Sequence, residues 1–468
     1  MLTQLPAEII AQIIEYLSKE GARSIALACR VLMEHAYRRL YRVIRIFVEN
    51  GNIIPYHAEL VLFHPHLLRY ASSLLILPSR RSPLSIRLRA HRENSPTSVD
   101  HLCSHLVTMY RLTSIMLYFA AGNHTAVLSA LEGLDPARRI MLDFNFDPMI
   151  EAYTIILDNP LPVQSIYLPM HESGYQLGNK LLHKCSQSIS RLGLLLHSTA
   201  IPDFPFLPHL RSFSLYLTGN SDRDLTPWLP FFIQHPSLTS VSLDCRFKSV
   251  SPVPLALLPN LRSIKAHPPI IQWLILGRPV HHADIQFYSS SSSNINTTFH
   301  SLPLSHGPIT TLDIDSSVFL SPDTLVDMIH SLPMLRILKL STVYQVRPQL
   351  KDRCLLTDFK QFPFVVESIL QAFGRCKHVQ RIQLRFRITD PIPDQTKYFW
   401  SIGDLIDMIV TMQESDAGDL WRFEIEGYFI AWEEKGTVER IGWLDVASQP
   451  KLKGEWKICL GNHNVVRY

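Results

Sequence analysis

Residues 238–243 read Leu-Thr-Ser-Val-Ser-Leu, and residues 210–215 repeat the same pattern as Leu-Arg-Ser-Phe-Ser-Leu. The shared form is apolar-x-x-apolar-x-apolar. Its second and third apolar residues are two positions apart, so on a β-strand their side chains point to one face, into a core. The residue between them and the residue after them then point to the opposite face. A single copy is weak evidence, because any buried strand can show this pattern.

Copies of the pattern continue along most of the chain. They occupy residues 112–117, 137–142, 163–168, 189–194, 210–215, 238–243, 261–266, 309–314, 335–340, 379–384 and 420–425, with a weak copy around Ile285. From residue 112 to residue 335 the steps run from 21 to 28 residues and average about 25. This is the period of leucine-rich repeats, in which each unit supplies one strand to a curved parallel sheet.

The predicted fold class is therefore α/β, with a short helical segment followed by an irregular leucine-rich-repeat solenoid that has a curved parallel sheet. Residues 41–46 and 67–77 are expected to form earlier strands. Helical patterns at 227–235 and 321–331 predict helices on the convex side. After residue 335 the steps lengthen, and residues 348–364 and 390–397 are expected to form loops at one rim.

The first 47 residues carry the pattern of three short helices. Apolar residues recur at helical spacing from Ile9 to Leu17, and Pro6 suits the first turn of a helix. Gly21 is expected to end this helix, and Ser24 to cap a second one, with a third over residues 32–41. Such a unit has a core too small to be stable alone, so it is expected to pack against a neighbour. That neighbour is either the following repeats or a partner chain.

The same segment resembles a known family. The residues that carry the resemblance are, in order, Leu5-Pro6-x-Glu8-Ile9, Ile13, Tyr16-Leu17, Ala26-Leu27-Ala28-Cys29-Arg30 and Leu40-Tyr41-Arg42. Together they resemble the F-box, especially as found in large fungal families. In that family the Leu-Pro start and the apolar face of the first helix contact the adaptor Skp1. The resemblance implies that the Skp1 contacts here are Leu5, Pro6, Ile9, Ile13 and Leu27.

This resemblance implies a substrate-receptor subunit of a Skp1–cullin–F-box ubiquitin ligase, without catalysis of its own. The implied partners are a Skp1-type adaptor, through it a cullin, and a protein substrate. The predicted domains are an F-box at 1–47, a repeat solenoid at 48–427 and a C-terminal cap at 428–468. One alternative is a leucine-rich-repeat scaffold or sensor whose N-terminal helices merely cap the solenoid. Another is a hydrolase or transferase in the irregular C-terminal third.

The outward strand positions define the expected substrate face. They include Tyr118, Asp143, Tyr167, Tyr216, Asp244, Asp313, Asp315, Lys339, Arg385, Glu424 and Glu426. Tyrosine offers a large contact area with few rotamers to freeze, so Tyr118, Tyr167 and Tyr216 are the candidate substrate contacts. The alternative is that they are ordinary exposed strand residues, since tyrosine is a good strand former.

Composition and missing motifs exclude several function classes. A net charge of +4 over 468 residues gives no support to nucleic-acid binding, which would require a basic face. No phosphate-binding loop, nucleophile elbow or His-Glu-x-x-His motif occurs, so no cofactor, metal or enzymatic activity is expected. The seven cysteines contain no Cys-x-x-Cys pair and suit a reducing compartment. Without a signal-peptide pattern or a run of about 18 apolar residues, the expected location is cytoplasmic, nuclear or both, away from the membrane.

Overall fold

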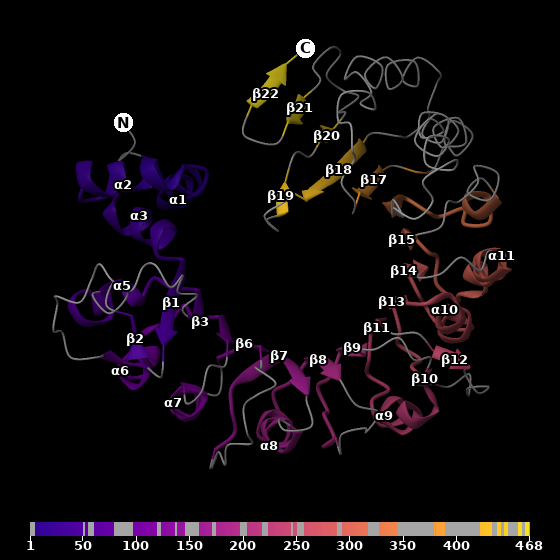
Figure 1. Cartoon of the computed structure of the whole chain (residues 1–468), viewed down its shortest axis with the longest axis horizontal. Coiled ribbons are helices and arrows are strands. Elements are labelled where there is room, and N and C mark those ends of the chain that lie inside the picture. Colours follow the sequence, from indigo (N-terminus) through magenta and orange to yellow (C-terminus); the bar gives the residue numbers. More distant parts are fainter. Residues whose placement is uncertain are drawn as a thin grey trace. The chain divides into compact units, whose positions relative to one another are not determined.

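The structure, a computed structural model, divides into two compact units, Met1–Gly219 and Asn220–Tyr468 (Figure 1). The residues that it describes are 5–49, 52–54, 60–78, 97–118, 123–135, 138–145, 159–170, 175–196, 204–217, 223–244, 247–249, 257–287, 293–316, 327–344, 379, 381–388, 422–432, 438–440, 444–447, 457–460 and 464–467.

The N-terminal segment forms three helices, α1 (Ala7–Glu15), α2 (Lys19–Ala28) and α3 (Met33–Leu40). The expectation that Gly21 ends a helix and that Ser24 caps the next one was wrong. Ser18 caps α2 instead, and its Oγ accepts the Gly21 N–H at 3.1 Å. A serine cap satisfies one of the N–H groups that a helix start leaves unpaired, which offsets the weak helix propensity of glycine in the first turn.

Unit 1 continues as a parallel sheet whose strands follow one another in chain order. These are β1 (Val43–Glu49), β3 (Ser73–Pro78), β5 (Ser114–Tyr118), β6 (Ile140–Asn145), β7 (Val163–Met170), β8 (Arg191–Leu196) and β9 (Ser212–Leu217). Two short strands, β2 (Asn52–Ile53) and β4 (Thr97–Ser98), pair antiparallel with each other, and β2 also pairs with β1. The helices lie on one side of this sheet (Figure 1). They are α5 (Pro65–Leu68), α6 (Val99–Ser104), η3 (Leu106–Thr108), α7 (Asn123–Glu132) and α8 (Tyr175–Cys185).

Unit 2 repeats the arrangement. Its parallel strands are β11 (Ser240–Asp244), β13 (Ser263–Ala266), β14 (His282–Phe287), β15 (Thr311–Ser316), β16 (Ile337–Tyr344), β17 (Arg381–Ile388) and β18 (Arg422–Trp432). Its helices are η5 (Thr226–Trp228), α9 (Leu229–Gln234), α10 (Pro268–Ile275), α11 (Ser293–Ser301) and η6 (Leu302–Leu304).

The remaining strands of unit 2 lie outside this parallel series. β10 (Arg223–Asp224) pairs in parallel with β12 (Phe247–Ser249), and β19 (Val438–Arg440) pairs antiparallel with β18. β20 (Leu444–Ala447), β21 (Lys457–Leu460) and β22 (Asn464–Arg467) form a separate antiparallel sheet. The predicted rim loops at 348–364 and 390–397 lie outside the described residues.

Strand register confirms the repeat. In each unit the second apolar residues of successive copies are direct neighbours across the sheet, and each is at most 2% exposed. They are Ile115, Leu142, Ile166, Leu192 and Phe213 in unit 1, and Val241, Ile264, Ala283, Leu312 and Leu338 in unit 2. The chain therefore has an α/β, leucine-rich-repeat-like fold with a curved parallel sheet.

One copy was aligned two residues out of register. The pattern in residues 137–142 places Ile140 second, but Leu142 is the residue that pairs with Ile115 and Ile166. Ile140 pairs with Val163, and the register shifts directly after it. Because side chains alternate with a period of two along a strand, Ile140 and Leu142 both face the core and satisfy the pattern equally well.

A recurring hydrogen-bond arrangement aligns each repeat with the next. The carbonyl group of Ser190 accepts the N–H groups of Arg211 and Ser212 at 2.8 and 3.0 Å. In unit 2, the Arg262 carbonyl accepts those of His281 and His282 at 2.8 and 3.1 Å. Each acceptor follows the first apolar residue of its copy, just before the strand. The start of each of these strands is therefore held at a fixed offset from its neighbour, which keeps the apolar residues stacked.

Candidate functional site

The three N-terminal helices enclose a small core. Ile10, Ile14 and Leu32 are buried together, with Leu17 and Ile25 packed against them. Ile10 and Ile14 are four positions apart in α1, so both side chains lie on the face that packs within the helical segment. Since this core holds only a few side chains, most of the remaining apolar residues of the segment stay outside it.

Several large apolar side chains of the segment are exposed. Their exposed fractions are 39% for Leu5, 41% for Ile9, 91% for Tyr16, 90% for Leu27 and 69% for Val31. Ile9 and Tyr16 are seven positions apart, so they lie on one face of α1, next to the buried face. Single exposed apolar residues are common on proteins, but a group of them on one small segment is typical of an interaction surface.

The predicted adaptor contacts fall mainly on this exposed side. Leu5, Ile9 and Leu27 are exposed, Pro6 is exposed and Ile13 is half-buried. Pro6 has a further local role, because its carbonyl group accepts the N–H groups of Ile9 and Ile10 at 3.1 Å each and so begins α1. The structure thus places these five residues on or next to the solvent-exposed face of the segment.

Two of the three predicted substrate contacts form a pair in unit 1. The rings of Tyr167 and Tyr216 pack edge to face, with centroids 5.9 Å apart and an angle of 68° between the planes. β8 runs between their strands, and its Gly193 lies directly opposite Tyr167. A Cβ atom at Gly193 would lie 2.5 Å from Cδ2 of Tyr167. Glycine therefore leaves the space that lets the Tyr167 ring lean across β8 toward Tyr216.

The outward positions around this pair are mostly apolar and half-buried. Phe47, Leu75, Met116 and Leu195 stand at such positions on β1, β3, β5 and β8. Asp143 lies opposite Tyr167 on β6, and burial raises the pKa of its carboxyl. Tyr118, the third predicted contact, is the last residue of β5, and its side chain lies outside the described residues. The outward row of unit 1 is thus an apolar and aromatic surface.

The outward row of unit 2 is charged. Lys265, Asp284, Asp313 and Lys339 stand side by side on β13, β14, β15 and β16. The Lys265 Nζ lies 3.2 Å from Oδ2 of Asp284, and the Lys339 Nζ lies 3.5 Å from Oδ2 of Asp313. The sequence had indicated Asp313 and Lys339, but Lys265 and Asp284 were missed. The position between the second and third apolar residues of each copy was the signal that could have found them.

Burial dominates the electrostatics of this charged row. It raises the pKa of Asp284 to about 6, although the neighbouring Lys265 acts in the opposite direction. Burial also lowers the pKa of His282, on the same strand, and the positive charge of Lys339 adds to this effect. The Nδ1 atom of His282 lies 3.4 Å from the Ser263 hydroxyl. These charges are paired and partly dehydrated, so the row is suited to contact another polar surface.

The described residues show no arrangement typical of a metal site, and burial suppresses the reactivity of two of their thiols. Among them, no group of three or more His, Cys, Asp or Glu side chains could hold a metal ion. Burial raises the pKa of both Cys103 and Cys185 to about 12, so these two thiols stay protonated. No helix within the described ranges is long and apolar enough to cross a membrane.

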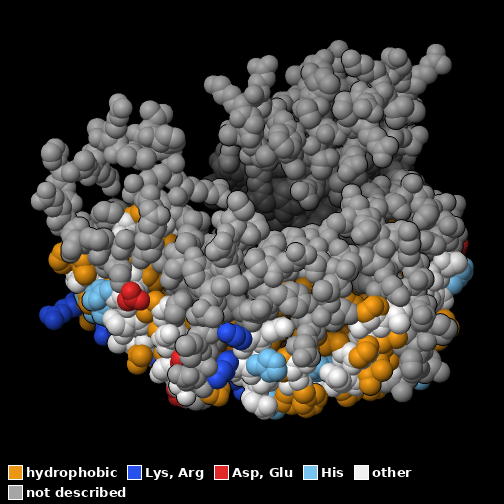
Figure 2. All heavy atoms as spheres, turned by 60° about the horizontal axis from the view of Figure 1, so that its bottom comes forward, with side chains coloured by type: hydrophobic (Ala, Val, Ile, Leu, Met, Phe, Trp, Pro, Cys, Tyr) orange, Lys and Arg blue, Asp and Glu red, His pale blue; other side chains and the backbone are white. Residues whose placement is uncertain are grey.

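The helix-bearing side of the repeats looks different from the outward strand rows. Figure 2 turns this side toward the viewer, and over the described residues hydrophobic, uncharged and charged side chains alternate there. Neither sign of charge forms a large patch on the described part of this face. The described part of this face therefore offers no single charged surface to a partner.

Comparison with known proteins adds little. No family model matches the sequence, and no curated protein matches it significantly. The crystal structure of a TLR13–ssRNA13 complex matches with a TM-score of 0.34 and 14% sequence identity, over 77% of this chain and 44% of that one. The chain thus spans less than half of that neighbour's length. At this TM-score the likeness carries no argument about fold or partners, and the fold assignment rests on the strand register.

Proposed function

We propose that this chain is the substrate-receptor subunit of a Skp1–cullin–F-box ubiquitin ligase. The N-terminal helices bind a Skp1-type adaptor, which links them to a cullin. The repeats hold a target protein, so the work of the chain is positional and it needs no catalytic group of its own.

The exposed apolar residues of the N-terminal helices carry the proposal. Leu5, Ile9 and Leu27 are exposed, and they are among the positions that the resemblance to the F-box assigns to Skp1. Burying such side chains against a partner removes apolar area from water, which favours binding by roughly 25 cal/mol per Å². If the helices merely capped the repeats, these side chains would be expected to pack against the repeats.

The outward row of unit 1 supports the proposal that the repeats hold a target protein. Tyr167 and Tyr216 present rigid aromatic area on strands, and the concave face of a repeat protein is its usual binding surface. Replacing both tyrosines by alanine should remove the target protein from affinity-purified material while Skp1 stays bound. Should the same proteins still co-purify, recognition lies elsewhere on the chain.

The proposed binding of the N-terminal helices to the adaptor is tested with the full chain and purified Skp1. Alanine in place of a buried interface anchor commonly costs about 2 kcal/mol or more, or roughly thirtyfold in affinity. The double variant Leu5→Ala, Ile9→Ala should therefore bind Skp1 at least about thirtyfold more weakly than wild type. Its thermal unfolding should stay close to that of wild type, because neither side chain belongs to the buried core.

A matched control separates loss of an interface from general loss of apolar surface. Leu62 and Val107 are exposed apolar residues of unit 1 outside the three N-terminal helices. The double variant Leu62→Ala, Val107→Ala should bind Skp1 as wild type does. Unchanged Skp1 affinity of the Leu5, Ile9 variant would favour the alternative, a repeat scaffold whose helices are only a cap.

A further inference from the structure

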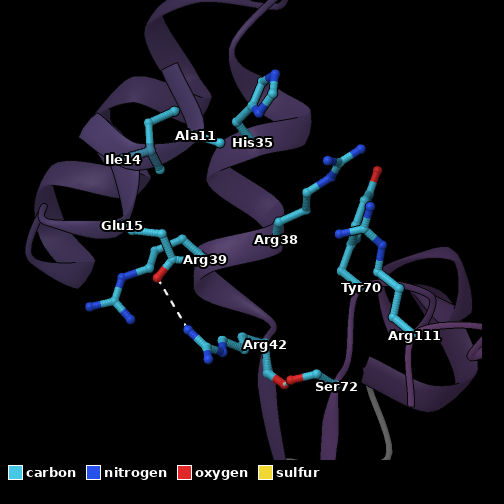
Figure 3. A pocket seen from close by; sticks show the side chains of 10 residues that line it. All are labelled: Ala11, Ile14, Glu15, His35, Arg38, Arg39, Arg42, Tyr70, Ser72 and Arg111. Atoms are coloured by element: carbon cyan, nitrogen blue, oxygen red, sulfur yellow. Dashed lines mark hydrogen bonds and ion pairs between the residues drawn. The ribbon is translucent and has the colours of Figure 1, made fainter. Parts of the chain in front are cut away.

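A pocket of about 240 Å³ lies where the N-terminal helices meet the first repeats of unit 1 (Figure 3). Its walls come from α1, α3, the segment before β3 and the segment before β5. The residues that line it are Ala11, Ile14, Glu15, His35, Arg38, Arg39, Arg42, Tyr70, Ser72 and Arg111. In Figure 3, Arg38, Tyr70 and Arg111 lie on one side, and Glu15, Arg39 and Arg42 on the other.

The charge of this pocket is strongly one-sided. Four arginines line it, against the single carboxylate of Glu15. Glu15 pairs with Arg42 at 3.2 Å, and Glu34, which is not a lining residue, pairs with Arg38 at 2.5 Å. Arg39 and Arg111 have no carboxylate within ion-pair distance among the described residues. The pocket thus carries about two positive charges that no described acidic group offsets.

The same pocket holds buried polar side-chain atoms that have no hydrogen-bond partner among the described residues. The Nε atoms of Arg38 and Arg39, which are donors, and the Nδ1 atom of His35, which donates or accepts according to its tautomer, are buried, and none has a hydrogen-bond partner within the described part of the protein. The Tyr70 hydroxyl accepts a hydrogen bond from Nη2 of Arg69 at 2.6 Å, so its own hydrogen is available to another acceptor. Buried polar atoms are nearly always satisfied in proteins, so the two Nε donors indicate an acceptor in the pocket, either water or a bound anion.

The unpaired positive charge and the size of the pocket indicate which kind of acceptor would fit. A phosphoryl group carries about −1.5 to −2 charges near neutral pH and three strong acceptor oxygens. Guanidinium groups match it in geometry, because each can donate two parallel hydrogen bonds to it. The volume corresponds to roughly eight water molecules at about 30 Å³ each, which suits a compact anion.

We propose that this pocket binds a small phosphorylated molecule on the side formed by Arg38, Tyr70 and Arg111, with Arg111 supplying the unpaired charge and Tyr70 a hydrogen bond. The simpler reading is a solvated basic face of α3, in which Arg38 and Glu34 form an ordinary pair one helical turn apart. That reading leaves unexplained why Tyr70 and Arg111, from other segments, close the same pocket. Because the ligand would touch both the helices and the repeat segments, its binding should also stabilise unit 1 against unfolding.

The experiment titrates the full chain with inorganic phosphate and with pyrophosphate by calorimetry, at constant ionic strength set with chloride. Pyrophosphate, which adds a second phosphoryl group, should bind more tightly than phosphate, and both should raise the unfolding temperature. Acetate, a single negative charge, should bind at least tenfold more weakly than phosphate. No adaptor takes part, so failure here leaves the proposed function untouched.

The double variant Arg38→Gln, Arg111→Gln should weaken pyrophosphate binding at least tenfold. The matched control is Arg30→Gln, Arg45→Gln, two exposed arginines of unit 1 that do not line the pocket, and it should bind as wild type does. An equal loss of pyrophosphate affinity in both variants would show that long-range electrostatic attraction, and not this pocket, holds the anion, and it would overturn the site. So would the lack of binding to either anion, and a phosphoserine peptide that binds more tightly than pyrophosphate would overturn the assignment to a small molecule.

Discussion

The two units share the same repeat architecture, but the outward positions of their strands carry side chains of different character. On the inward side, Phe213 of unit 1 and Leu338 of unit 2 occupy the same position of the repeat, and both are fully buried. On the outward side, unit 1 presents Tyr167 and Tyr216 among half-buried apolar residues, whereas unit 2 presents two lysine–aspartate ion pairs. The repeat thus constrains one face of each strand and leaves the other free to vary.

The largest expected effect comes from changing the inward face, and it should be similar in both units. Phe213→Ala should lower the free energy of unfolding by about 3–5 kcal/mol and Leu338→Ala by about 2–5 kcal/mol, through lost burial and a residual cavity. Denaturant titration measures both. Replacing the outward serines Ser214 and Ser341 by alanine should change it by less than about 0.5 kcal/mol. An inward variant as mild as the serine controls would contradict the comparison.

This contrast also explains what could be predicted from the sequence. Burial demands an apolar residue at each inward position, so the strands and their order could be predicted. The alignment of residues 137–142 failed because a shift of two residues leaves the same face inward. The start of α2 was misplaced because Ser18 and Ser24 are both suitable caps, and only the bond from Gly21 to Ser18 distinguishes them.

The charged pairs and the basic pocket depend on contacts between distant segments. Lys265 meets Asp284 only through the register of two strands, and Arg111 lines the same pocket as Arg38 only because β1, β3 and β5 are neighbours. Neither contact follows from local spacing. The exposed residues of α1 could be predicted more directly, because a helix with apolar residues at Ile9, Ile10, Ile13 and Ile14 has more apolar surface than one small core can cover.

A second prediction concerns the charged row of unit 2 and its pH dependence. Burial raises the pKa of Asp284 from 3.8 to about 6, so between these values the folded chain binds more protons than the unfolded chain. Its contribution to stability is therefore present at low pH and is lost as the pH rises through about 6. At roughly 1.4 kcal/mol per pKa unit, Asp284→Asn should be more stable than wild type by about 3 kcal/mol at pH 7.

The measurement is the free energy of unfolding of both proteins from pH 4 to pH 7. At pH 4 the two values should differ by less than about 1 kcal/mol, because Asp284 is then protonated in the folded wild-type protein and partly protonated in the unfolded chain. If the ion pair with Lys265, at 3.2 Å, outweighed burial, the variant would instead be less stable than wild type at neutral pH. That outcome would contradict the account in which burial, and not ion pairing, dominates the electrostatics of the charged row in unit 2.

A third, smaller effect tests the aromatic row of unit 1. Gly193→Ala would place a Cβ atom 2.5 Å from the Tyr167 ring, which must then move away from Tyr216. The expected cost is about 1–2 kcal/mol of stability, as is usual for overpacking. In a Tyr167→Ala background the same change should be nearly neutral, and a double-mutant cycle measures the difference. Gly133→Ala, which meets only an ordinary contact at 3.5 Å, is the matched control.

The central claim is that the exposed N-terminal helices bind an adaptor while the strand rows stay available for a target. Amide hydrogen exchange of the full chain, alone and with purified Skp1, tests it most directly. Added Skp1 should slow exchange across α1 and α2, where Ile9 and Leu27 lie, and should leave β13 to β16 unchanged. Unchanged exchange in α1 and α2, or protection centred on the repeat strands, would contradict it.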